Sequence, residues 1–137
     1  GISLMVWSPL AGGFLSGKYS DGNTANHGRR TSFDFPPVNL ERGDAAIAVM
    51  RGIASAKDCT VAQVALAWLL HQLVVTSVIV GARRIDQLQD NIRSTQLALS
   101  AEDLAALDAV TKLPAEYPGW MLERQSQYRA GFLPQKG

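Results

Sequence analysis

The stretch VVTSVIVGARRIDQLQDNI, residues 74–92, decides the fold class of this chain. Its leading VVTSVIV is apolar and dense in β-branched side chains, which predicts a strand buried on both faces, as in a parallel sheet. Gly81 ends the strand, and apolar residues then recur on one side of a helix at Ile85, Leu88 and Ile92. A buried strand that turns directly into a helix is typical of parallel α/β folds.

A second strand of the same type is predicted near the start of the chain. The run ISLMVW, residues 2–7, is continuously apolar. Two such strands joined through helices form a βαβ unit with a right-handed crossover. Because two strands alone cannot bury both of their faces, we expect the missing neighbours to come from upstream sequence or from another copy of the chain. A strand that begins at the second residue, without an initiator Met, suggests a cut, so residues 1–137 are predicted to be a single partial domain.

Three further helices are predicted, each with its own N-terminal signal. They span residues 44–58, 60–72 and the stretch after Ser100. Asp44, Thr60 and Ser100 are the expected N-cap residues, and Gln63 completes a capping box with Thr60. The region 11–43 is rich in Gly, Asn, Ser and Pro and is predicted to be one long loop, while residues 114–137 are predicted to be an irregular tail.

Composition excludes several classes of protein. Apolar residues make up 47 % of the 137-residue chain and charged residues 18 %, with a net charge of +1, so we expect a globular domain without a nucleic-acid or membrane-surface partner. The sequence has no apolar run long enough to span a membrane, and residues 1–15 do not predict a signal peptide because they lack a basic segment. The single cysteine, Cys59, cannot form an intramolecular disulfide and suits a reducing compartment, so a cytoplasmic location is expected.

Two stretches carry the residue types of a binding site, and each directly follows a predicted strand. In the first, Gly12, Gly13 and Gly17 allow close backbone approach, the amides of residues 10–15 could face an anion, and Lys18 adds a positive charge. Ligands bind at the carboxyl ends of strands in parallel α/β folds. The alternative is a glycine-rich turn that binds nothing.

The second stretch, residues 81–91, places two arginines at the start of a helix. A helix N-terminus attracts anions, and Arg83 and Arg84 suit a phosphate, unless both are merely solvated surface charges. Gln87 and Asn91 lie four residues apart on one helical face, where their amides could read the edge of a heterocycle. The two stretches support each other, because the loops after strands 7 and 8 of a (β/α)8 barrel often build a phosphate site.

Three motifs, in this order and spacing, resemble the C-terminal part of an aldo-keto reductase: WSPLAGGFLSGKY, TVAQVALAWLL and VIVGARRIDQLQDN. LALSAEDLAALDAV resembles the helix that follows in that family, so the resemblance covers nearly the whole chain. It implies an α/β fold that is the C-terminal fragment of a (β/α)8 TIM barrel, helix-rich and unable to close a barrel alone. Residues 2–10 would be strand 7 and residues 74–80 strand 8.

The resemblance also implies an NADP(H) site. Trp7 matches the aromatic residue that stacks on the nicotinamide, and the loop that ends at Lys18 matches the clasp around the pyrophosphate. Arg83 or Arg84 matches the partner of the adenosine 2′-phosphate, which favours NADP over NAD. The implied cofactor-binding residues are Trp7, Ser8, Leu10, Gly12, Leu15, Gly17, Lys18, Gly81, Ala82, Arg83, Arg84, Gln87 and Asn91.

The catalytic Asp, Tyr, Lys and His of the family lie on earlier strands that this sequence does not contain. The intact parent is expected to reduce a small aldehyde or ketone with NADPH, an upstream tyrosine donating the proton. No catalytic residue and no metal ligand is assigned here, and the chain alone is expected to be inactive. In the tail, Tyr117 and Trp120 are candidates for the mouth of the site.

Exposed barrel faces would favour a homo-oligomer of the fragment. Two alternatives to an enzyme remain. One is a non-catalytic regulatory subunit that binds the nicotinamide cofactor, and the other is a helical interaction module whose loops bind nothing.

Overall fold

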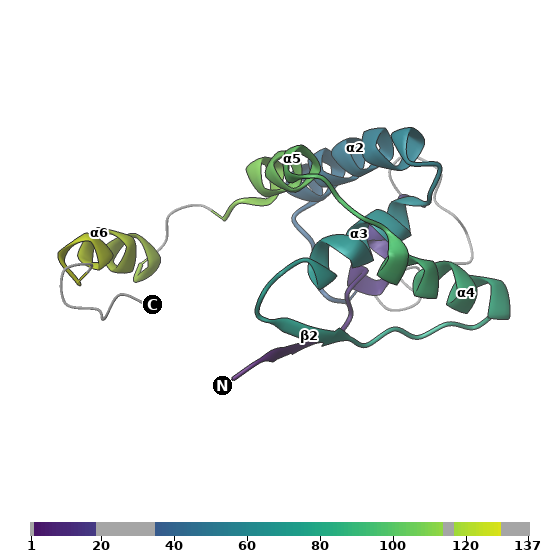
Figure 1. Cartoon of the computed structure of the whole chain (residues 1–137), viewed down its shortest axis with the longest axis horizontal. Helices are drawn as coiled ribbons and strands as arrows, with labels where there is room; N and C mark the ends of the chain where they lie inside the picture. Colours follow the sequence, from purple (N-terminus) through teal and green to yellow (C-terminus); the bar gives the residue numbers. More distant parts are fainter. Residues whose placement is uncertain (1, 19–34, 114–116, 130–137) are drawn as a thin grey trace.

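The computed structural model describes residues 2–18, 35–113 and 117–129 (Figure 1). The described residues form two strands, five α-helices and two 3₁₀ helices, and the strands lie together at one side of the helical body. In chain order the elements are β1 (Leu4–Val6), η1 (Ala11–Ser16), α2 (Leu40–Ala56), α3 (Val61–Leu70), β2 (Val75–Val78), α4 (Ile85–Arg93), η2 (Ser94–Gln96), α5 (Ala101–Thr111) and α6 (Gly119–Arg129).

The two strands pair in parallel, which confirms the predicted arrangement of residues 2–7 and 74–80 while shortening both strands. Leu4 is opposite Val75 and Val6 is opposite Val78, with an irregularity in the register after Leu4. The chain passes from β1 through η1, α2 and α3 before it returns as β2. Because the strands run in the same direction, the segments that leave them emerge at the same edge of the sheet.

The prediction that both strands are buried on both faces is wrong for this chain. Leu4 is 52 % exposed, Met5 62 % and Val74 61 %. Within the described ranges no third strand flanks β1 or β2, and α3 packs against β2. The apolar side of α4 is also exposed, at Ile85, Leu88 and Ile92. These side chains form an apolar surface that the described residues leave uncovered.

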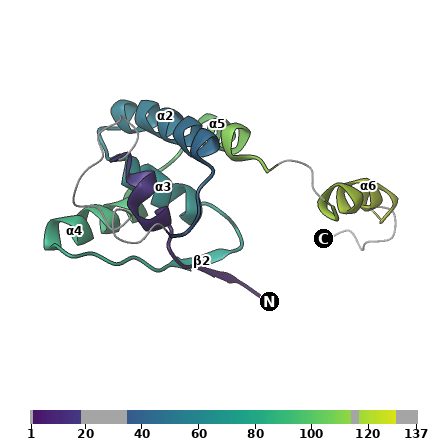
Figure 2. The same ribbon diagram turned by 180° about the vertical axis from the view of Figure 1, so that it is seen from behind.

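The core lies among α2, α3 and α5, away from the sheet. Figures 1 and 2 show α5 lying beside α2, with α3 beneath them. Ile47 and Met50 of α2, Val64 of α3 and Leu107 of α5 are almost completely buried in one cluster. Burying each such side chain contributes about 1.5–3 kcal/mol, so this helical layer supplies most of the stability. Leu104 and Val110 of α5 pack against the same cluster.

The predicted caps of α3 and α5 are confirmed, and that of α2 is wrong. The Ser100 hydroxyl accepts a hydrogen bond from the amide of Asp103, whose carboxylate accepts one from the Ser100 amide, which completes a capping box. The Thr60 hydroxyl caps α3 by accepting a hydrogen bond from the amide of Gln63, without a reciprocal bond from the Gln63 side chain. Helix α2 begins a turn earlier than predicted, because Asn39 and not Asp44 accepts the capping hydrogen bond.

Two segments predicted to be irregular contain regular structure. Residues 11–16 of the predicted loop 11–43 form η1, and α2 begins at Leu40, while residues 19–34 lie outside the described residues. In the predicted irregular tail, residues 119–129 form α6, which stands apart from the other helices in both views (Figures 1 and 2). Residues 114–116 and 130–137 also lie outside the described residues.

In the described part of the chain, no single helix is long and apolar enough to cross a membrane. Helices α2 and α3 meet such a criterion only as a pair, across a bend of 100°.

A substitution at Gly43 tests the packing of η1 against the core. A Cβ atom at this position of α2 would lie 2.4 Å from Cε1 of the buried Phe14 ring. We therefore expect Gly43→Ala to lower the free energy of unfolding by about 1–3 kcal/mol, as overpacking does in other cores. Urea unfolding followed by circular dichroism measures this change.

The matched control is Gly52→Ala in the same helix, where an added Cβ meets nothing within 4 Å. It should raise the free energy of unfolding by about 0.5–1 kcal/mol, because alanine is the better helix former. Equal stabilisation by both substitutions would contradict the close packing of Phe14 on Gly43.

Candidate functional site

The segments that follow β1 and β2 meet in a cleft of about 960 Å³, which we call the main cleft. The Ile79 amide donates to the Val6 carbonyl at 2.9 Å, so the two chains leave the sheet side by side. Volumes of this order are typical of ligand sites. Of the predicted cofactor-binding residues, those that line the main cleft are Trp7, Ser8, Leu10, Gly12, Lys18, Gly81, Ala82, Arg83, Gln87 and Asn91.

Of the predicted residues, Leu15 and Gly17 do not line this cleft, and Arg84 lines a smaller pocket beside it. Leu15 packs against the hydrophobic core. Gly17 lies over Val61 and Ile47, and its carbonyl accepts a hydrogen bond from the Arg51 guanidinium at 3.2 Å. The structure therefore places both on the core side of the loop.

Tyr117 and Trp120, expected near the mouth of the site, line neither the main cleft nor the pocket beside it. Both side chains are exposed at the start of α6. Since α6 stands apart from the helices around the cleft, the structure does not bring these two aromatic residues to the site.

The turn after β1 is held by its own backbone. The amides of Ala11 and Gly13 donate to the carbonyls of Ser8 and Leu10, and the Leu15 amide also donates to Leu10. The prediction that the amides of residues 10–15 face an anion is therefore wrong for these three donors. Positive charge at this side of the cleft comes instead from the exposed side chain of Lys18.

This turn also contains backbone that side chains rarely adopt. Ser8 and Ala11 have φ angles of 53° and 49°, in the left-handed region. Non-glycine residues in this region cost on the order of 1–3 kcal/mol each, and they concentrate at functional sites. The core contact of Phe14 within η1 holds the turn in place despite that cost.

Arg83 and Arg84 have different surroundings. The Arg83 amide donates to the Gln87 side chain at 3.3 Å, just before α4 begins. The Arg83 guanidinium makes no hydrogen bond or ion pair with any residue that the structure describes. Arg83 lines the main cleft. A guanidinium without a protein partner can bind an anionic ligand without first breaking another contact.

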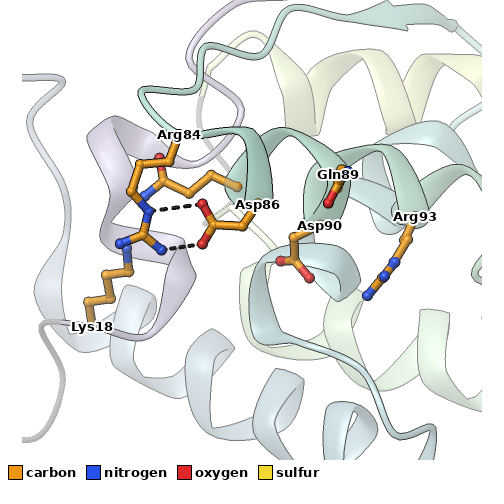
Figure 3. Close-up of a pocket in the computed structure, with 7 residues that line it drawn as sticks. Lys18, Arg84, Asp86, Gln89, Asp90 and Arg93 are labelled. Atoms are coloured by element: carbon orange, nitrogen blue, oxygen red, sulfur yellow. Dashed lines mark hydrogen bonds and ion pairs between the residues drawn. The ribbon is translucent and has the colours of Figure 1, made fainter.

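Arg84 instead lines a smaller pocket of about 390 Å³, shown in Figure 3. Its Nε donates to Asp86 Oδ1 at 2.9 Å, and its Nη2 donates to Asp86 Oδ2. The hydrogen bond from Arg84 lowers the pKa of the Asp86 carboxyl below its ordinary value. Lys18, Gln87 and Asp90 line both cavities, so the small pocket adjoins the main cleft.

Asp90 is a residue that sequence reasoning missed. Its carboxylate accepts hydrogen bonds from Thr60 Oγ1 at 2.8 Å and from Gln63 Nε2 at 2.6 Å. The Gln63 side chain therefore bonds to α4 and does not complete the predicted capping box of α3. This network fixes α4 against the start of α3, and with it Gln87 and Asn91, which flank Asp90 along the helix.

Other candidate chemistry is not supported by the structure. Among the described residues, no group of three or more His, Cys, Asp and Glu side chains could hold a metal ion. Cys59 is half-buried, and burial raises the pKa of its thiol, which makes the thiolate less accessible at neutral pH.

We expect Asp90→Ala to lower the free energy of unfolding by about 1–3 kcal/mol, because it leaves the amide of the buried Gln63 without its acceptor. Chemical unfolding measures this, with Asp44→Ala on the exposed side of α2 as the matched control. If both variants unfold at the same denaturant concentration, the network does not hold α4 to α3.

Comparison with known proteins identifies the family. The sequence profile of the Aldo/keto reductase family matches residues 1–112. The chain is 33 % identical over 114 residues to L-glyceraldehyde 3-phosphate reductase of Escherichia coli O157:H7, covering 79 % of this chain and 33 % of that protein. It is 38 % identical over 111 residues to Protein tas of Escherichia coli K12, covering 80 % of this chain and 32 % of that protein. The chain is 31 % identical over 121 residues to Aldo-keto reductase str7 of Strobilurus tenacellus, covering 87 % of this chain and 36 % of that protein.

The chain thus spans about a third of the length of the curated relatives it matches. The family implies a (β/α)8 barrel, and a helix-rich structure with two parallel strands is consistent with part of one. The resemblance of the three motifs to aldo-keto reductases is confirmed. The chain belongs to the aldo/keto reductase family.

Proposed function

We propose that this chain is the C-terminal, cofactor-binding part of an NADP(H)-dependent reductase of aldehydes or ketones. The observation that carries the proposal is the main cleft, in which the segments after both strands converge and the Arg83 guanidinium has no partner among the described residues. The family membership supports the reaction class.

The residues of the main cleft fit the chemical parts of NADP(H). Trp7 is 59 % exposed at the end of β1, so its indole offers a flat surface for the nicotinamide ring. Lys18, after η1, and Arg83, just before the N-terminus of α4, offer positive charge for phosphates. Gln87 and Asn91 present amides for a heterocycle edge. When bound, the cofactor supplies the hydride for carbonyl reduction.

Between the two candidate arginines, the proposal assigns the 2′-phosphate to Arg83. Arg84 already donates two hydrogen bonds to Asp86, whereas the Arg83 guanidinium has no partner among the described residues. A phosphate at Arg83 gains a charge-assisted hydrogen bond without displacing a carboxylate. This assignment makes Arg83 the residue that distinguishes NADP from NAD.

The proposal also locates the reaction chemistry outside these 137 residues. The family's catalytic Asp, Tyr, Lys and His have no counterpart in the motifs of this sequence, so the proton donor for the carbonyl oxygen comes from elsewhere in the whole protein. Binding of NADPH by the chain and turnover by the whole protein are therefore separate properties.

Titration of the chain with NADP⁺ and NAD⁺, followed by calorimetry and tryptophan fluorescence, tests the assignment. We expect Arg83→Ala to weaken NADP⁺ binding about tenfold or more and NAD⁺ binding much less, because a charged hydrogen bond to the 2′-phosphate is worth about 1.5–3 kcal/mol. Arg124→Ala, an exposed arginine on α6, controls for the loss of one charge. Failure of the wild-type chain to bind either dinucleotide would refute the proposal.

We further propose that the chain by itself self-associates through its uncovered apolar surface. Leu4, Met5 and Val74 of the sheet region and Ile85 and Ile92 of α4 are exposed. Apolar area of this kind is removed from water when two copies meet. Light scattering at micromolar concentration should give a mass above that of one chain, and a monomeric mass would contradict self-association.

A further inference from the structure

We propose that Asp86 limits the affinity of the site for a phosphate monoester, because its carboxylate competes with the phosphate for Arg84. This inference rests on the proposed NADP(H) function and assigns a specificity-determining role to a residue that need not touch the cofactor. On this view Arg84 is a second cation beside Arg83, and it can bind a phosphate only when Asp86 is displaced.

The geometry of the pair explains the competition. Arg84 uses its Nε and Nη2 atoms on the two carboxylate oxygens of Asp86, so one full edge of the guanidinium is occupied (Figure 3). A phosphate favours the same two-pronged arrangement with arginine. Carboxylate and phosphate therefore compete for one set of donors.

The ion pair of Arg84 and Asp86 lies beside the proposed phosphate site. Arg84 and Asp86 line the small pocket together with Lys18, and Lys18 also lines the main cleft. An anion bound between Lys18 and Arg83 thus lies beside the pocket that contains Arg84. The other carboxylate shared by the two cavities, Asp90, accepts hydrogen bonds from Thr60 and Gln63, which leaves Asp86 as the carboxylate paired with Arg84.

The pair is also weak enough to exchange. The side chains of Arg84 and Asp86 are 67 % and 59 % exposed, and ion pairs this exposed add little stability. A ligand phosphate can therefore displace Asp86, but part of its binding energy is used to do so. Removing the carboxylate removes that cost and strengthens phosphate binding.

The helical position of Asp86 provides a matched control. Asp86 is the second residue of α4, where an acidic side chain favours the helix N-terminus whether or not it pairs with an arginine. Glu102 is the second residue of α5, is exposed, and lines neither cavity. Asp86→Asn and Glu102→Gln therefore make the same change of charge at equivalent helical positions.

The test compares adenosine 2′,5′-bisphosphate with adenosine 5′-monophosphate, which lacks the 2′-phosphate, by calorimetry on the chain at low salt. We expect Asp86→Asn to tighten binding of the bisphosphate by about two- to fivefold relative to the monophosphate, the range of an exposed ion pair. Glu102→Gln should leave both affinities unchanged. An unchanged ratio in Asp86→Asn would overturn the inference while the proposed function stands.

A double-mutant cycle with Arg84→Gln separates competition from a general effect of charge. Competition predicts that Asp86→Asn has no effect once Arg84 is removed. Equal tightening with and without Arg84 would overturn the inference, because the carboxylate would then act on the ligand directly. If the wild-type chain binds neither adenosine ligand, the proposed function fails as well.

Discussion

The parallel pairing of β1 with β2 is the constraint on which the site depends. The Leu4 amide donates to the Val74 carbonyl at 2.7 Å at one end of the pair, and the Ile79 amide donates to Val6 at 2.9 Å at the other. Parallel strands bring their carboxyl ends to the same edge. Residues far apart in the sequence, Trp7 and Arg83, consequently line a single cleft.

The helices hold this edge in place. Phe14 anchors the turn after β1 in the core beside Gly43, and Asp90 ties α4 to the start of α3 through Thr60 and Gln63. One wall of the cleft is therefore fixed by a contact in the core, and the other by the hydrogen bonds of Asp90. The left-handed backbone at Ser8 and Ala11 is maintained by this support, which is how strained turns persist in binding sites.

Local interactions and the parallel pairing of the two strands could be predicted from the sequence, whereas the side-chain contacts between helices could not. Ser100 with Asp103 forms a cap within one turn of helix, so its pattern is readable from adjacent residues. The pairing of Gln63 with Asp90 joins two helices, and no local pattern distinguishes it from a capping box with Thr60. Leu15 was predicted at the ligand but packs on the core, because the direction of a side chain in a loop depends on the packing around it.

The burial of the two predicted strands also could not be predicted from local sequence. Their apolar composition predicted burial, but burial depends on neighbours that the described residues do not supply, and Met5 and Val74 are exposed. The difference between Arg83 and Arg84 likewise depended on the structure: the arginines are adjacent in sequence, and only the second pairs with Asp86.

The central claim is that the segments after β1 and β2 form one binding site. Chemical-shift changes of the backbone amides on addition of NADP⁺, measured on the ¹⁵N-labelled chain, test it most directly. The account predicts that amides in both residues 7–18 and residues 81–91 shift together, with one dissociation constant, while those of α5 stay unchanged. Shifts confined to one segment, or two unequal dissociation constants, would contradict a single site.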